Sequence, residues 1–165
     1  GFVNVYAINY SSIFTSFDNA LEKLGKFVQR LPAPDPSQPV IIIGHSLGGL
    51  LARAYAEKTS PSSAPAAIIT LGTPHKGSRM AAFGFGRLAR DILYEGELFS
   101  RLGQGSETLP CPAFALISPA DALVLPYDGL EPPAGWIVHE TQPMSHISML
   151  YSGTVAGKII ELIKK

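Results

Sequence analysis

The sequence predicts an α/β fold, with a mainly parallel sheet and flanking helices. Short segments rich in aliphatic and β-branched residues alternate with longer segments whose apolar residues recur at helical spacing. Strands that alternate with helices imply βαβ crossovers, which join parallel strands. The chain has 165 residues, of which 46% are hydrophobic and 16% are charged. We therefore expect a single domain, residues 1–165, with a packed core.

The first part of the chain predicts two strands and two helices. Residues 2–9 are rich in β-branched and aromatic residues and predict a strand. Residues 40–43 read VIII and predict a central strand, because they are apolar on both faces. Between the strands, Thr15 or Ser16 is expected to cap a helix that ends before a proline-rich loop. A second amphipathic helix is expected to begin at Leu47.

The second part of the chain predicts three strands and a closing helix. The strands are expected at residues 66–72, 111–117 and 135–141. Residues 77–109 contain several glycines and no strand pattern, so short helices and loops inserted over the fold are expected there. The closing helix is expected to present one apolar face, formed by Val155, Ala156, Ile159, Ile160 and Ile163.

Composition excludes several classes of function. The 13 basic and 13 acidic residues balance to a net charge of zero, so no nucleic-acid partner is expected. A single cysteine, Cys111, permits neither an internal disulfide nor a cysteine-rich metal site. No His, Asp or Glu cluster has metal-ligand spacing, and we expect no metal or cofactor. No apolar run has the length of a transmembrane helix, and the first residues read as the interior of a folded domain rather than as a signal peptide. The cellular compartment stays open.

A candidate nucleophile lies between the second predicted strand and the helix that follows it. Residues 44–48 read GHSLG, which is a G-x-S-x-G motif. A sharp strand-to-helix turn needs neighbours without bulk, and Gly44 and Gly48 provide them. The helix N-terminus would direct its dipole and free N–H groups towards Ser46. The backbone N–H of Leu47 would then donate to a tetrahedral oxyanion. In this context we interpret the serine as a nucleophile rather than as an idle residue in a glycine turn.

The general base that a serine hydroxyl needs has one favoured candidate among the four histidines. His146 follows the last predicted strand in a loop, from which it can reach across the strand ends to Ser46. His45 lies inside the turn itself and is expected to be structural. His75 follows a strand but precedes any candidate acid in chain order. His139 lies within a predicted strand and is expected to be a surface or packing residue.

The acid that fixes the histidine tautomer is predicted to be Asp121. It follows the predicted strand 111–117, in a loop at the strand's carboxyl end. The resulting chain order of nucleophile, acid and base is the order found in α/β-hydrolases. Asp128 and Glu131 are alternatives further along the same loop. Because Asp128 precedes Gly129, it is more simply explained as a turn residue.

These motifs resemble the bacterial lipases and esterases of the α/β-hydrolase superfamily, over essentially the whole chain. GHSLGGLLARAY resembles their nucleophile turn and helix, TLGTPHKGS the next strand and turn, ISPADALVLP the acid loop and MSHISMLYS the base loop. The resemblance implies a serine hydrolase in which Ser46, Asp121 and His146 transfer an acyl group from an ester or lipid substrate to water. It also implies a lid over residues 77–109, whose apolar residues would favour an acyl chain: Met80, Phe83, Phe85, Leu88, Ile92, Leu93, Leu98 and Phe99. For any single one of these, ordinary packing is the simpler expectation.

One departure from the family pattern concerns the second oxyanion donor. In the family, an H-G loop and its strand precede the strand that resembles residues 2–9, and that loop supplies the second N–H. We expect either a longer protein or an oligomer that completes the sheet, or direct pairing of residues 2–9 with 40–43. In the latter case residues 9–14 would offer a substitute donor. The departure also keeps open an alternative function, an inactive or nearly inactive hydrolase-fold fragment that binds a partner or a hydrophobic ligand.

Overall fold

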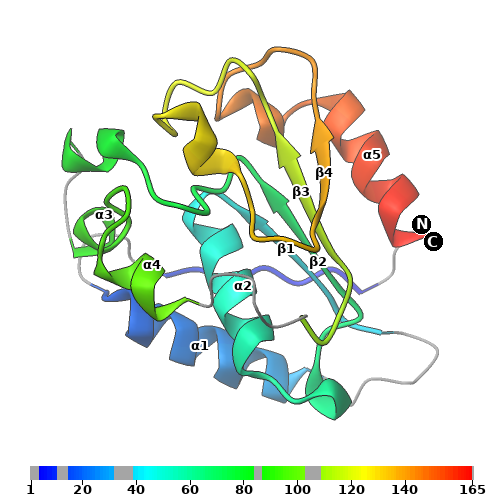
Figure 1. Ribbon diagram of the computed structural model, residues 1–165. Helices are drawn as coiled ribbons and strands as arrows, with labels where there is room; N and C mark the ends of the chain where they lie inside the picture. Colours follow the sequence, from blue (N-terminus) through cyan, green and yellow to red (C-terminus); the bar gives the residue numbers. More distant parts are fainter. Residues whose placement is uncertain (1–3, 11–14, 32–38, 84–86, 103–108, 165) are drawn as a thin grey trace.

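The core of the protein is a four-stranded parallel sheet with the strand order β1-β2-β3-β4 (Figure 1). The computed structural model describes residues 4–10, 15–31, 39–83, 87–102 and 109–164. The strands are β1 (Ile41–His45), β2 (Ala67–Leu71), β3 (Ala113–Ile117) and β4 (Ile137–Glu140), each parallel to its neighbour. Because all four strands run in one direction, the loops that follow them meet at one edge of the sheet.

Helices cover both faces of the sheet. Helices α1 (Phe17–Arg30) and α2 (Leu47–Lys58) lie on one face, and α5 (Gly153–Ile163) lies on the other (Figure 1). Short α-helices and 3-10 turns occupy the connections: η1 (Pro61–Ser63), η2 (Arg79–Phe83), α3 (Arg87–Asp91), α4 (Glu97–Arg101), η3 (Tyr127–Leu130) and η4 (Ser148–Leu150). The predicted fold class, a mainly parallel sheet with flanking helices, is confirmed.

The ends of the helices follow the local sequence. Ser16 caps α1, where its hydroxyl accepts a hydrogen bond from the Asn19 N–H at 3.3 Å. On α5 the buried face consists of Val155 and Leu162, and Ile159 and Ile163 pack beside them. The predicted face was partly wrong, because Ala156 and Ile160 are exposed. Each lies one residue after a packed position, and one residue turns about 100° around a helix.

The prediction of a strand at residues 2–9 was wrong over the part that the structure describes. Residues 4–10 form no strand and pair with none of the described strands (Figure 1). Val5 is 80% exposed, whereas Ile8 packs against the cluster between α1 and α2. A β-forming composition yields a strand only where a neighbouring strand supplies backbone hydrogen bonds, and this segment forms no ladder with the described strands.

The prediction that residues 40–43 form a central strand was also wrong for the described sheet. Among the described strands β1 pairs only with β2, so it lies at an edge. Ile43 is consequently 47% exposed, whereas all five residues of β3 are buried. Apolar residues on both faces indicate a strand that is covered on both faces, but they do not say how many neighbouring strands it has.

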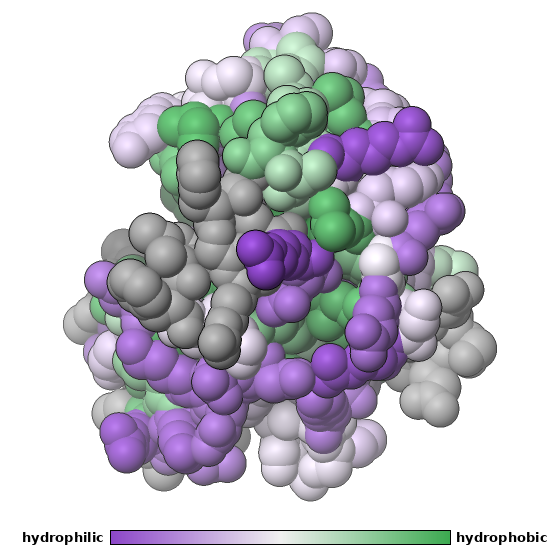
Figure 2. Space-filling view, turned by 90° about the vertical axis from the view of Figure 1, so that its left-hand side faces the viewer, coloured by the Kyte–Doolittle hydropathy of each residue, from purple (hydrophilic) through white to green (hydrophobic). Residues whose placement is uncertain are grey.

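The segment predicted as an insertion contains η2, α3 and α4. Three of its apolar residues, Leu88, Leu98 and Phe99, are buried in the cluster with α1 and α2, so they contribute to packing. Phe83 is 78% exposed, and Phe85 lies outside the described residues. Figure 2 views the molecule from the left-hand side of Figure 1 and shows hydrophobic residues gathered in the upper part of that face, above a more hydrophilic lower part.

Within the described ranges, no helix combines the length and hydropathy needed to cross a membrane.

Candidate active site

A buried acid–base pair lies at the carboxyl edge of the sheet. His146, in the loop after β4, and Asp121, in the loop after β3, are 5% and 4% exposed. His146 Nδ1 is 2.7 Å from Asp121 Oδ2. The other carboxylate oxygen, Oδ1, accepts hydrogen bonds from the backbone N–H groups of Leu123 at 2.9 Å and Val124 at 3.1 Å. Because both oxygens have partners, the carboxylate is held in one orientation.

Ser46 stands at the sharp turn between β1 and α2. Its backbone has φ 52° and ψ −123°, a conformation that residues other than glycine rarely adopt. The Ser46 N–H donates to the Leu71 carbonyl at 2.9 Å, and the Thr73 hydroxyl donates to the Ser46 carbonyl at 3.1 Å. The surrounding chain therefore holds the strained turn from both sides. The Ser46 side chain makes no capping hydrogen bond to α2, so capping does not occupy its hydroxyl.

Two glycines allow the close approach of chain segments around this turn. A Cβ atom at Gly44 would overlap the backbone of Gly48, and a Cβ atom at Gly49 would overlap the Thr73 side chain. At Gly48 itself, an added Cβ atom would meet only the Tyr10 hydroxyl, at an ordinary 3.6 Å. The sequence motif pointed to Gly44 and Gly48, whereas the tight contacts in the structure are at Gly44 and Gly49.

His45 links this turn to the loop that carries His146. Its Nε2 donates to the His146 carbonyl at 3.0 Å, and the two ring centroids are 4.6 Å apart. Burial lowers the pKa of His45, because removal from water disfavours the charged imidazolium. This contact gives the residue a structural role and brings the Ser46 turn next to the acid–base pair.

Gly72 is a residue of this site that sequence reasoning missed. It follows β2 with φ +51°, and an added Cβ atom would lie 3.0 Å from Asp121 Oδ2 and 3.1 Å from His146 Nδ1. A side chain there would push against the acid–base pair. The available signal was a glycine at the carboxyl end of a buried strand, where functional residues gather in such sheets.

The other candidate histidines have different surroundings. His75 is 2% exposed; its Nε2 lies 3.1 Å from the Thr70 hydroxyl, and its carbonyl accepts a hydrogen bond from Arg53 at 3.0 Å. Burial lowers the pKa of His75 to about 3, and the charge of Arg53 adds to this shift. His139 is half-buried on β4. The structure thus brings His146, and not His75, to Asp121.

The alternative acids also have other partners. Asp128 accepts a hydrogen bond from the Tyr94 hydroxyl at 2.7 Å, which, with burial, raises the pKa of Tyr94 to about 12. Glu131 forms an exposed ion pair with Lys76 at 2.6 Å. Over the described ranges, no group of three or more His, Cys, Asp and Glu side chains could hold a metal ion. Of the three carboxylates, Asp121 is the one that contacts a histidine.

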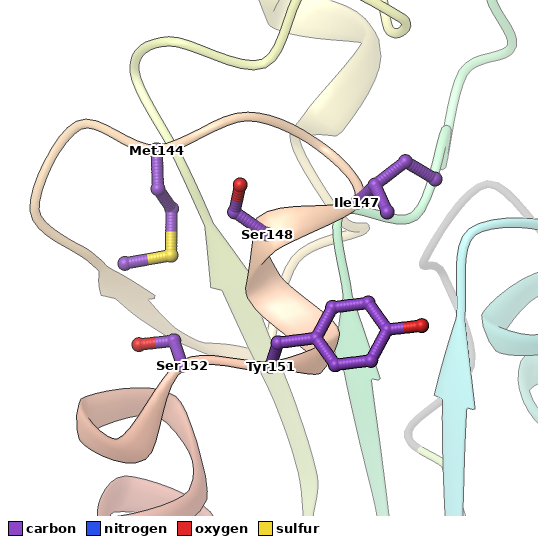
Figure 3. Close-up of a pocket in the computed structure, with 5 residues that line it drawn as sticks. All are labelled: Met144, Ile147, Ser148, Tyr151 and Ser152. Atoms are coloured by element: carbon purple, nitrogen blue, oxygen red, sulfur yellow. The ribbon is translucent and has the colours of Figure 1, made fainter.

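The predicted oxyanion donor and a nearby hollow complete the description of this edge. Leu47 is the first residue of α2, and the first N–H groups of a helix lack intrahelical acceptors. A surface hollow adjoins the His146 loop and is lined by Met144, Ile147, Ser148, Tyr151 and Ser152 (Figure 3). Figure 3 shows the Ile147 and Tyr151 side chains on the side of the hollow nearer β1. None of the predicted catalytic residues lines this hollow.

The fold and the comparisons with known proteins place the chain among the lipases and esterases of the α/β-hydrolase superfamily. The protein-family model described as palmitoyl protein thioesterase matches residues 3–106, which is more than half of the chain. The chain therefore belongs to this family.

Curated relatives match part of the chain. A triacylglycerol lipase of Pseudarthrobacter phenanthrenivorans is 39% identical over 82 residues, which are 48% of this chain and 25% of the relative. A triacylglycerol lipase of Burkholderia plantarii is also 39% identical over 82 residues, 48% of this chain and 22% of the relative. The matched region thus spans about a quarter of the length of these lipases.

Solved structures share the fold at low sequence identity. Phospholipase PlaB from Legionella pneumophila superposes with a TM-score of 0.62 at 19% identity, over 70% of this chain and 31% of that one. ClbQ from the colibactin NRPS/PKS pathway superposes with a TM-score of 0.57 at 20% identity, over 90% of this chain and 77% of that one. At these identities the likeness establishes the α/β-hydrolase fold alone.

Proposed function

We propose that this chain is a serine carboxylic-ester hydrolase of the lipase/esterase kind. Ser46 is the nucleophile, His146 the general base, Asp121 the acid that orients it, and the Leu47 N–H an oxyanion donor. The observation that carries the proposal is the buried 2.7 Å hydrogen bond between His146 and Asp121, in the loop next to the strained Ser46 turn.

The first half-reaction forms an acyl-enzyme. His146 Nδ1 is engaged by Asp121, so Nε2 is the nitrogen left to accept the Ser46 proton. As the Ser46 oxygen bonds to the ester carbonyl carbon, the carbonyl oxygen becomes an oxyanion that accepts from the Leu47 N–H. When the tetrahedral intermediate collapses, the carbon–alkoxy bond breaks and His146 returns the proton to the departing alcohol.

Water repeats the cycle in the second half-reaction. His146 Nε2 takes a proton from water, whose oxygen attacks the acyl carbonyl, and the bond to Ser46 breaks as the serine regains a proton. Throughout, the Asp121 carboxylate stabilises the transient imidazolium. The products are a carboxylic acid and an alcohol.

A thioester is the second candidate substrate. The matching family model carries the description palmitoyl protein thioesterase, whereas the curated relatives are named triacylglycerol lipases. The triad chemistry serves both classes of substrate, because only the leaving group differs.

We assign residues 77–109 to a lid-like covering of the site. Exposed Phe83, Leu123 and Leu125 supply apolar surface for an acyl chain.

A fluorophosphonate probe tests the nucleophile directly. The folded protein is expected to form one covalent adduct, located on Ser46 by peptide mass spectrometry, and the Ser46→Ala variant is expected to form none. Hydrolysis of p-nitrophenyl esters and of acyl thioesters of matched chain length then separates the two substrate classes. A folded protein that leaves Ser46 unlabelled contradicts the proposal.

That negative result would favour the alternative, an inactive or nearly inactive hydrolase-fold fragment that binds a partner or hydrophobic ligand. Two observations motivate it. Ile43 on the edge strand β1 is 47% exposed, and the Leu47 N–H is the one oxyanion donor that we assign among the described residues. Binding of a fluorescent fatty acid without labelling of Ser46 is the result expected from this alternative.

A further inference from the structure

We propose that Ser118 is a positioning residue that sets where His146 lies relative to Asp121. The proposal rests on the function proposed above, because it concerns the acid and the base assigned there. Ser118 is the first residue after β3 and is 0% exposed. It begins the loop that carries Asp121, three residues before the carboxylate, and its hydroxyl is directed to the other loop.

One hydroxyl joins the two loops through both of its hydrogen-bonding functions. Ser118 Oγ donates to the Met144 carbonyl at 2.6 Å and accepts from the Met144 N–H at 2.9 Å. It also accepts from the Ala120 N–H at 3.3 Å. A serine hydroxyl has one proton and two lone pairs, so these three bonds use its full capacity. Met144 lies two residues before His146, so the two Ser118–Met144 hydrogen bonds hold the base loop at a point close to the imidazole.

The same residue also holds the acid side. The Ser118 carbonyl accepts a hydrogen bond from the Asp121 N–H at 3.2 Å. The parallel pairing of β3 with β4 is continued by the Thr141 N–H, which donates to the Ile117 carbonyl at 2.8 Å. One residue after Ile117, the Ser118 hydroxyl forms the next hydrogen bonds between the end of β3 and the loop that carries His146. The path from the carboxylate to the imidazole through this buried side chain is therefore short.

A purely stabilising role predicts a different result from a positioning role. If Ser118 only holds the fold together, its loss lowers the folded fraction and leaves kcat per folded molecule unchanged. If it sets the position of His146, its loss lowers kcat with little change in KM, because ground-state binding does not depend on the acid–base geometry.

The experiment compares Ser118→Ala with Ser145→Ala in the intact chain. Ser145 is the matched control, because among the described residues its hydroxyl bonds within the base loop, to the Ser148 hydroxyl at 2.6 Å and the Ser148 N–H at 3.2 Å. For folded Ser118→Ala we expect kcat to fall about 10- to 100-fold while KM stays within about twofold. For Ser145→Ala we expect both constants to stay within about twofold of wild type.

A second readout does not depend on turnover. The proton between His146 Nδ1 and Asp121 Oδ2 is expected to give a downfield proton NMR resonance, lost or shifted in Ser118→Ala and kept in Ser145→Ala. An unchanged resonance in the folded Ser118→Ala variant, or an unchanged kcat, overturns the proposal. If wild type neither turns over nor labels at Ser46, the proposed function fails, while the resonance still decides the role of Ser118.

Two further measurements apply if Ser118→Ala does not fold. Ser118→Cys fills similar space with a weaker donor, and the same outcomes decide the proposal for it. In wild type the Met144 amide is expected to exchange slowly with solvent, because the buried Ser118 hydroxyl accepts its hydrogen bond. Exchange as fast as that of an exposed loop amide overturns the proposal.

Discussion

The loops at the carboxyl edge and the segment of residues 4–10 differ in how the structure holds them. At the carboxyl edge, the backbone of Ser46 has partners at both its N–H and its carbonyl, and His146 is bonded through its ring and its carbonyl. In the segment of residues 4–10, Val5 is 80% exposed and Tyr6 is 50% exposed. The Asn9 carbonyl accepts a hydrogen bond from the exposed Lys23 ammonium at 2.5 Å.

This difference shows what hydrogen-bonding neighbours contribute to local structure. Residues 4–10 have the composition of a strand yet form none, because they do not pair with any described strand. Ser46 adopts a backbone conformation unfavourable for its residue type, yet it is held there by β2 and the turn after it. The first region is therefore expected to tolerate change, and the second is not.

The largest effect is expected from the acid of the proposed triad. Asp121→Asn should lower kcat about 10⁴-fold, because the amide no longer selects the histidine tautomer that accepts the serine proton. Asp128→Asn is the matched control, since Asp128 contacts Tyr94 and not a histidine, and it should change kcat less than about threefold. Hydrolysis of a p-nitrophenyl ester measures both variants. Loss of activity in Asp128→Asn alone would move the acid assignment to that residue.

A smaller effect is expected on the free energy of unfolding, which should fall at acidic pH because of His75. Its pKa falls from 6.5 to about 3 on folding, so between these values the unfolded chain binds a proton that the folded chain does not. The contribution of neutral His75 to stability is thus fully present above pH 6.5 and is lost progressively as the pH falls towards 3.

His75→Gln keeps a side chain able to bond Thr70 but removes this titration. Urea unfolding between pH 7 and pH 4 should show a shallower loss of stability for the variant than for wild type. Equal slopes for the two proteins would mean that His75 is not buried as a neutral residue in solution.

The smallest effect is expected in the segment of residues 4–10. Val5→Ser should change the free energy of unfolding by less than about 0.5 kcal/mol, because the Val5 side chain is 80% exposed. Ile69→Ala provides the contrast, since Ile69 is fully buried in β2 and should cost about 2–5 kcal/mol. Urea midpoints measure both. A cost above about 1 kcal/mol for Val5→Ser would show that the Val5 side chain is packed in solution.

Much of the fold could be predicted from local patterns. The strands at β1 to β4 and the cap at Ser16 follow from residue types and their spacing, which act over a few neighbouring residues. The G-x-S-x-G turn is local in the same sense. Asp121 and His146 were predicted from their places after successive strands, because a parallel sheet brings carboxyl-end loops together.

What the sequence by itself determined is therefore the places of β1 to β4 and of the main helices between and after them, and the residue types available at their ends. Only the tertiary structure decided that β1 lies at an edge of the described sheet, that residues 4–10 form no strand, and that Gly72 lies against the acid–base pair. It also decided that the Ser118 hydroxyl meets Met144, 26 residues further along the chain. Contacts between residues far apart in sequence depend on how strands are placed beside one another, and local propensity carries no information about that placement.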